Sequence, residues 1–168
     1  TGRLGPSALI GIQAVLIGLA IGLILGILAA WKHNSGIDYF TMILAVLGVS
    51  VPNFVAAALL QYYIGLKWGV LPVGFWTGWN CSVLPSIALS FSATAMVARF
   101  MRTEMLDVLD QDYIVTARAK GLSQMKVLMR HAVRNSILPV VTILGPIVVN
   151  LMTGSLAVEN IFSIPGIG

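Results

Sequence analysis

The amino-acid sequence predicts an all-α protein that crosses a membrane several times. Hydrophobic residues make up 58% of the 168 residues and charged residues only 10%, which is far more apolar than an ordinary soluble domain. Four continuous apolar segments are long enough to cross a hydrocarbon core, which takes roughly 20 helical residues. They cover about 8–30, 40–65, 83–101 and 137–158. Strands are disfavoured because a membrane barrel alternates polar and apolar residues along each strand. We therefore expect 1–168 to be one transmembrane domain with four spanning helices.

The first segment presents small residues at every fourth position, on one face of the helix. They are Ala14, Gly18, Gly22, Gly26 and Ala30. Such a face lets another helix approach closely. It is compatible with a surface that slides between two conformations. Static packing is favoured, because faces of this kind hold helices together in membrane proteins of many functions.

Prolines predict where the helices bend. Pro52 and Pro146 lie well inside the second and last segments, where each removes a helix hydrogen bond, so we expect kinks there. Pro85 and Pro139 are expected in first helical turns, where a missing N–H does little harm.

The distribution of Lys and Arg predicts the orientation. Eight of the ten basic residues lie in 31–39 and 99–135, whereas the other two lie in 1–6 and in the 66–82 loop. Basic residues favour the cytoplasmic side of short membrane loops. Residues 31–39 and 99–135 are therefore expected in the cytoplasm. Both chain ends and the 66–82 loop are expected outside.

Polar residues within the spans are few, and full charges are nearly absent there. Intramembrane charges mark ion paths, proton relays and voltage sensors, so none of these is predicted. Asn53, Thr142 and Asn150 are candidates for lining a hydrophilic path. For any one of them, bonding to a neighbouring helix is the favoured role.

The sequence offers no catalytic, metal or cofactor site. His33, His131 and the single cysteine, Cys81, have no companions at ligand spacing. No Ser/His/Asp or paired-carboxylate arrangement at catalytic spacing is found. The dipeptide Gly-Lys does not occur, which excludes a phosphate-binding loop of the G-x-x-x-x-G-K-[ST] kind. If ATP drives this protein, another chain must hydrolyse it.

The stretch 99–135 has helical patterning of its own. The span that ends near residue 101 continues as an amphipathic helix. A short helix around 114–120 is expected to end at Gly121, where a left-handed stop costs little. Ser123 is then expected to cap a second helix, whose basic residues repeat every four positions: Lys126, Arg130 and Arg134. The expected product is a helix–glycine–helix elbow. From patterning alone, a docking element and a solvated loop are equally favoured.

Two stretches resemble one family. Residues 112–122, DYIVTARAKGL, with 130–135, RHAVRN, resemble the cytoplasmic coupling loop of dipeptide/oligopeptide ABC importer permeases. Residues 154–168, GSLAVENIFSIPGIG, are similar to a second stretch of that family. Their order and the span pattern also fit, so the resemblance covers essentially the whole chain. Residues 51–54 and 68–72 resemble the first of the two permeases that such importers pair.

The coupling loop departs in part from the general importer pattern E-A-A-x-x-x-G-x9-I-x-L-P. Gly121 is retained, and Ala117 matches the second Ala. The positions that differ are Val115, Thr116, His131, Val133 and Arg134. The Ala-Arg-Ala-Lys-Gly form is the peptide-type variant, so the resemblance implies that coupling is intact. The residues it implies for coupling to an ATPase are Thr116, Ala117, Arg118, Ala119, Lys120, Gly121, Leu122, His131 and Asn135.

The resemblance implies a six-span type I ABC importer permease of the bacterial inner membrane. The chain begins at Thr1 without a Met and is expected to be a fragment that lacks the first and last spans. The implied partners are a second permease subunit, two cytoplasmic ATP-binding subunits, an external solute-binding protein and membrane lipid, with no nucleic acid and no cofactor. Peptides are the expected substrates, and nickel complexes and oligosaccharides stay open because similar permeases carry them.

Two other classes of function are disfavoured. A channel or secondary transporter would need intramembrane acids or a ladder of charges. A membrane-bound enzyme would need a catalytic cluster near the interface. Neither pattern is found in the sequence.

Overall fold

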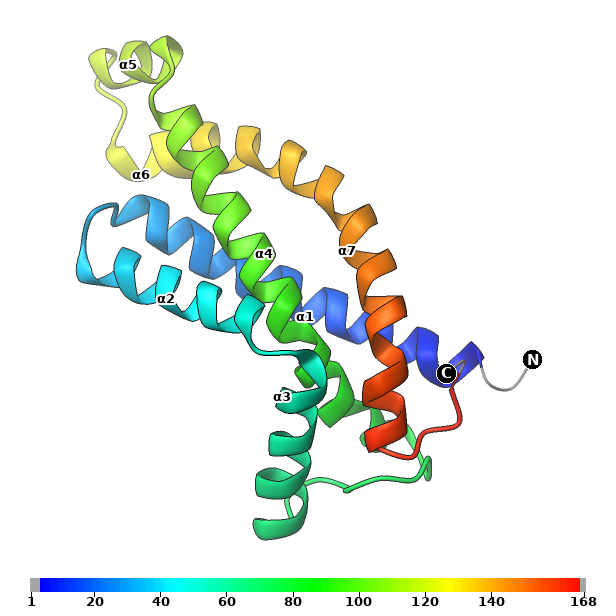
Figure 1. The fold of residues 1–168 in the computed structure, drawn as a ribbon. Helices are drawn as coiled ribbons and strands as arrows, with labels where there is room; N and C mark the ends of the chain where they lie inside the picture. The colour runs from blue at the N-terminus through cyan, green and yellow to red at the C-terminus, as the bar shows by residue number, and fades with distance from the viewer. Residues whose placement is uncertain (1–3, 167–168) are drawn as a thin grey trace.

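The computed structural model describes residues 4–166, and only the backbone of residues 153–155. Over this range the chain is helical apart from its connecting segments, which confirms the all-α prediction (Figure 1). The elements are α1 (Leu4–Trp31), α2 (Gly36–Ser50), α3 (Asn53–Leu60), η1 (Gln61–Lys67), η2 (Trp79–Ser82), α4 (Val83–Leu109), α5 (Asp112–Ala119), α6 (Gln124–Val127), η3 (Leu128–Val133) and α7 (Arg134–Ile161).

The tightest helix pair is α1 with α4. The small residues of α1 form its buried stripe, as predicted: Ala14, Gly18, Gly22, Gly26 and Ala30. A Cβ built on Gly22 would lie 2.7 Å from the Val97 Cβ and 2.9 Å from the Thr94 carbonyl oxygen. Contacts this short leave no room for any side chain, so the glycines set the distance between the two helices. Large apolar residues on the opposite side of α1, such as Ile12, Leu16 and Ile24, are exposed, as expected for a helix that faces lipid.

The second apolar segment is broken at Pro52. α2 and the α3–η1 helix meet at an angle of 98°, so residues 40–65 do not form one straight helix. Val51 has extended backbone angles (φ −83°, ψ 117°), because the ring of a following proline disfavours the helical conformation. The predicted kink at Pro52 is therefore confirmed. Within residues 4–166, three helices are long and apolar enough to span a membrane, or four if this bent pair counts as one span.

The prolines of α4 and α7 behave differently from each other. Pro85 is the third residue of α4, in its first turn as predicted. The placement of Pro139 in a first turn was wrong. α6 and η3 extend α7 backwards without a break, so Pro139 and Pro146 both lie inside a continuous helix. That helix curves along its length in Figure 1.

Hydrogen bonds to backbone carbonyl groups join the bent pair, and the loop that follows it, to the end of α7. The side-chain amide nitrogen of Gln61 (Nε2) donates to the carbonyl oxygens of Val73, over 2.6 Å, and Ile161, over 2.9 Å. The Phe75 N–H also donates to the Phe162 carbonyl oxygen, over 3.0 Å. Gln61, a polar residue inside an apolar segment, therefore joins segments of the fold.

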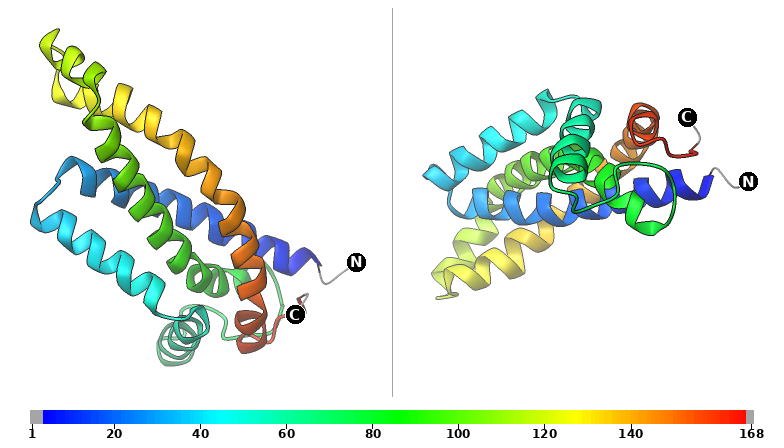
Figure 2. Two further views of the ribbon diagram at one scale, coloured as in Figure 1. Left: turned by 45° about the horizontal axis from the view of Figure 1, so that its top comes forward. Right: turned by 90° about the horizontal axis from the view of Figure 1, so that it is seen from below.

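Elements distant in sequence gather at the two ends of the molecule. The α1–α2 turn lies at the same end as α5 and α6, whereas both termini lie at the other end (Figures 1 and 2). This is the arrangement that the charge distribution requires. Which end faces the cytoplasm stays a prediction.

Ser123 provides a direct test of that orientation, because it is exposed in the turn between α5 and α6. In a Cys81→Ser background, we expect Ser123→Cys to resist a membrane-impermeant thiol reagent in intact cells and to react after permeabilisation. Asn80→Cys, which is exposed at the opposite end, is the matched control and should react in intact cells. The reverse pattern would overturn the topology.

Candidate functional site

The elbow between α5 and α6 is built on a glycine turn. α5 ends at Ala119, and Gly121 follows in the left-handed region at φ +78°. The Gly121 N–H donates to the Arg118 carbonyl oxygen over 2.9 Å, and the Leu122 N–H to that of Ala117 over 3.3 Å. This pair of bonds is a Schellman-type helix end, in which the left-handed residue is usually glycine. The predicted stop at Gly121 is confirmed.

A small apolar cluster fixes the shape of the elbow. Ile114 and Ala117 of α5 are buried against Val127 of α6, and Val108 and Leu109 of α4 pack on them. A further bond runs from the Asn135 amide nitrogen of α7 to the Tyr113 hydroxyl of α5, over 3.0 Å. The elbow is therefore attached to the ends of both α4 and α7.

The outer surface of the elbow carries basic residues beside exposed apolar ones such as Val115 and Met125. Of the residues implied for coupling to an ATPase, the exposed ones are Thr116, Arg118, Ala119, Lys120, Gly121, Leu122 and Asn135. Arg118 and Lys120 lie on this surface together with the stripe of Lys126, Arg130 and Arg134. Within residues 4–166, no ion pair neutralises these five cations. The surface is thus suited to an acidic partner.

Two residues of the elbow lie differently from expectation. Ala117 is 7% exposed, so its small size serves the packing inside the elbow. Ser123 occupies the N-cap position of α6, but its side chain makes no capping hydrogen bond. The first amide groups of α6 lie at an exposed turn, where water can satisfy them. His131 is half-buried in η3.

A partly polar cavity lies between α2, α4 and α7. Its volume is about 430 Å³, and its polar lining residues are Arg99, Thr103 and Asn150. Of the three path candidates, only Asn150 lines it. The Thr142 hydroxyl donates to the Pro139 carbonyl oxygen within α7, and Asn53 is half-buried at the start of α3. Arg99 and Thr103 were missed, because the sequence shows their charge and polarity without the cavity that they face.

A larger cavity of about 540 Å³ lies between α1, α2 and α4. Its wall is almost entirely apolar and includes Ala45, Gly48 and Ala95. An apolar wall offers a polar solute few hydrogen bonds, so the smaller cavity suits a hydrophilic path better. The larger one lies beside the small residues of the α2 face that packs on α4.

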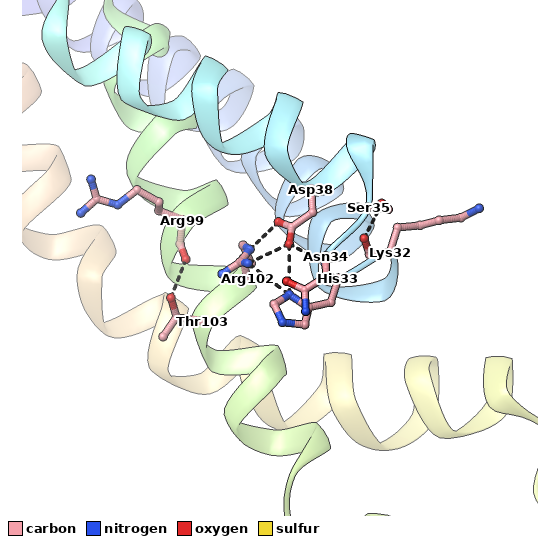
Figure 3. Close-up of polar contacts among 8 residues, drawn as sticks. All are labelled: Lys32, His33, Asn34, Ser35, Asp38, Arg99, Arg102 and Thr103. Carbon is pink, nitrogen blue, oxygen red and sulfur yellow. Dashed lines mark hydrogen bonds and ion pairs between the residues drawn. The ribbon is translucent and has the colours of Figure 1, made fainter.

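A buried ion pair joins the first turn of α2 to α4, and Figure 3 shows its geometry. The Arg102 guanidinium donates from Nε to Asp38 Oδ1 over 2.6 Å and from Nη2 to Oδ2 over 2.8 Å. The Asn34 N–H donates to the same Oδ2 over 3.0 Å, and His33 Nδ1 lies 3.0 Å from it. Asp38 is 1% exposed. His33 therefore does have a carboxylate neighbour, contrary to the sequence-based expectation, although no group of three metal ligands forms among the described residues.

Residues 22–168 match the family model described as "Binding-protein-dependent transport system inner membrane component". The chain belongs to this family. The predicted family and the inner-membrane, multi-pass location are thereby confirmed.

Curated relatives within the permease family carry peptide-transport names. The chain is 44% identical over 166 residues to "Dipeptide transport system permease protein DppB" of Lactococcus lactis subsp. cremoris, covering 99% of this chain and 55% of the relative. It is 47% identical over 161 residues to the protein of that name from Bacillus subtilis, covering 95% of this chain and 52% of the relative. It is 42% identical over 166 residues to "Oligopeptide transport system permease protein OppB" of Salmonella typhimurium, covering 96% of this chain and 54% of the relative. The chain spans about half the length of these curated relatives.

A solved structure supports the permease fold. The "Crystal structure of an amino acid ABC transporter with histidines" aligns with 98% of this chain and 72% of that chain, at a TM-score of 0.75 and 19% sequence identity. At this identity the likeness concerns the fold alone. It confirms the polytopic all-α fold class.

Proposed function

We propose that this chain forms part of the membrane path of an ATP-driven peptide importer and that the α5–α6 elbow docks on a partner ATPase. The observation that carries this proposal is the attachment of the elbow. α4 leads into α5 across two residues, and α6 and η3 continue directly into α7. A force applied to the elbow therefore acts on two membrane-crossing helices at once.

The same two helices line the partly polar cavity. Arg99 and Thr103 belong to α4, Asn150 belongs to α7, and α2 contributes Val49. A movement of the elbow that displaces α4 relative to α7 would change access to this cavity. Such a displacement is what alternating access requires of a transporter.

The substrate is proposed from the names of the relatives and from the chemistry of the cavity. A guanidinium, a hydroxyl and an amide can bond the carboxylate and the amide groups of a short peptide. Asn53 and Thr142 are kept as further path candidates. Nickel complexes and oligosaccharides are the alternative cargoes.

The partners are proposed from the family and from the exposed surfaces of the chain. ATP hydrolysis is assigned to two cytoplasmic ATP-binding subunits, because the sequence has no phosphate-binding loop. A second permease subunit completes the path, with this chain as the first of the pair. An external solute-binding protein delivers the peptide, and lipid covers the exposed apolar helix faces. The outer residues of the elbow, with His131 and Asn135 behind it, form the proposed coupling site.

The test is ATP-driven uptake by the reconstituted full-length complex. We expect uptake of the dipeptide Ala-Ala only with both ATP and the ATP-binding subunits present, and no ATP hydrolysis by the permease alone. A deletion strain should lose growth on defined peptides and keep it in nickel-limited medium. Uptake without ATP-binding subunits would favour a channel. A defect confined to nickel-limited medium would replace the peptide by a nickel complex.

A further inference from the structure

The Asp38–Arg102 ion pair is the polar link between α2 and α4. The residues of α2 that face α4 are Asp38, Thr41, Ala45 and Gly48, which share one helix face. The three small residues let the helices approach closely at Gly48, where a Cβ would lie 3.0 Å from the Ala95 Cβ, and leave the cavity of about 540 Å³ beside them. Such apolar contacts do not fix a direction. Among the described residues, the ion pair is therefore the hydrogen-bonded link that fixes α2 to α4 in one orientation.

The pair also lies at the base of the elbow. Arg102 is on the last two turns of α4, before that helix ends at Leu109 and α5 begins at Asp112. Both of its bonds to Asp38 are shorter than 3 Å, and a bidentate guanidinium–carboxylate pair fixes direction as well as distance. Asn34 and His33 hold the carboxylate from the α1–α2 turn. Asp38 is thus fixed on both sides.

We propose that Asp38 and Arg102 form a latch that makes α2 follow α4 when the elbow moves, so that both are positioning residues for the coupling of ATP hydrolysis to transport. This proposal rests on the proposed function. Val49 of α2 lines the path cavity beside Arg99 of α4. If α2 follows α4, the α2 and α4 sides of the cavity move together relative to α7. If the latch is absent, α4 moves and α2 lags behind it.

The decisive variant removes both charges, Asp38→Asn with Arg102→Gln. Removal of one partner alone leaves a buried charge unpaired and endangers folding, whereas removal of both does not. The matched control is Lys32→Gln with Glu104→Gln. It also removes one cation and one carboxylate, from the α1–α2 turn and from α4, and neither residue belongs to the ion pair.

Two measurements are made on the full-length complex in lipid vesicles. The first is the number of ATP molecules hydrolysed per Ala-Ala dipeptide taken up. The second needs no substrate: the reactivity of Val49→Cys with a thiol reagent, with and without ATP and vanadate, in a Cys81→Ser background. Val49 is 44% exposed in the described chain and lies on the cavity wall.

We expect the decisive variant to assemble with the ATP-binding subunits and hydrolyse ATP, but to consume about tenfold more ATP per dipeptide, in the range of known coupling energies. The nucleotide-dependent change in Val49→Cys reactivity should disappear. The control should match the wild type in both measurements. The latch proposal would be overturned if the decisive variant kept the wild-type ATP consumption per dipeptide and the wild-type nucleotide response. Failure of the variant to assemble would also overturn it, because the ion pair would then serve folding. A wild-type complex without any nucleotide response would instead contradict the proposed function.

Discussion

Gly121→Val is expected to abolish most ATP-driven uptake while the membrane-crossing helices stay folded. Gly121 has a φ of +78°, a region that costs residues with a Cβ about 1–2 kcal/mol and β-branched residues more. A Cβ there would meet no atom within 4 Å, so the strain comes from the backbone alone. The cluster that fixes the elbow has only three buried residues and cannot resist such strain. Because each 1.4 kcal/mol is a factor of ten in an equilibrium, we expect at least about a tenfold loss of ATPase association.

The measurement is co-purification with the ATP-binding subunits, together with uptake. Gly121→Asn is the matched control, since asparagine tolerates the left-handed region and should keep most of the activity. Ala119→Arg separates docking from turn geometry, because Ala119 is exposed and lies outside the strained position. It should weaken association without altering the elbow, whereas Ala117→Arg would disrupt the elbow cluster itself. Normal association and uptake in both Gly121→Val and Ala119→Arg would refute the docking role.

Gly22→Leu is expected to separate α1 from α4 and to have the largest effect on folding. A Cβ at residue 22 would lie 2.7 Å from the Val97 Cβ, 2.8 Å from its Cγ1 and 2.9 Å from the Thr94 carbonyl oxygen. Two of these atoms belong to the backbone or its first side-chain carbon, so rotamer changes cannot relieve the clash. Overpacking typically costs about 1–3 kcal/mol, and a whole leucine against a helix backbone should exceed that range.

Gly11→Leu is the control for this substitution, in the same helix. A Cβ at residue 11 would meet nothing within 4 Å. Both substitutions gain the same helix propensity, roughly 1 kcal/mol over glycine, so their difference isolates the helix contact. The measurement is the yield of monodisperse protein and its thermal unfolding in detergent. Equal stability of the two variants would show that the α1–α4 contact is not the tight one described.

The local features of the elbow and of the spans could be predicted from the sequence. The turn at Gly121 and the break at Pro52 follow from backbone restrictions that one or two residues impose on themselves. The packing face of α1 follows from the helical period. The wrong placement of Pro139 also comes from considering neighbouring residues alone. The sequence around this proline favours a helix start, whereas η3 is a helix over 128–133 and continues directly into α7.

Composition, periodicity and backbone restriction act within a few neighbouring residues, so they predict the membrane class, the helical segments, the close-packing face of α1 and the glycine elbow. Which polar groups meet depends instead on the packing of the helices. Asp38 and Arg102 are 64 positions apart, and Arg99 faces a cavity that three helices must enclose. Ala117 is buried because α6 folds back over it. Such contacts depend on where whole helices cross, and no local pattern along the chain encodes the distance between two side chains on different helices.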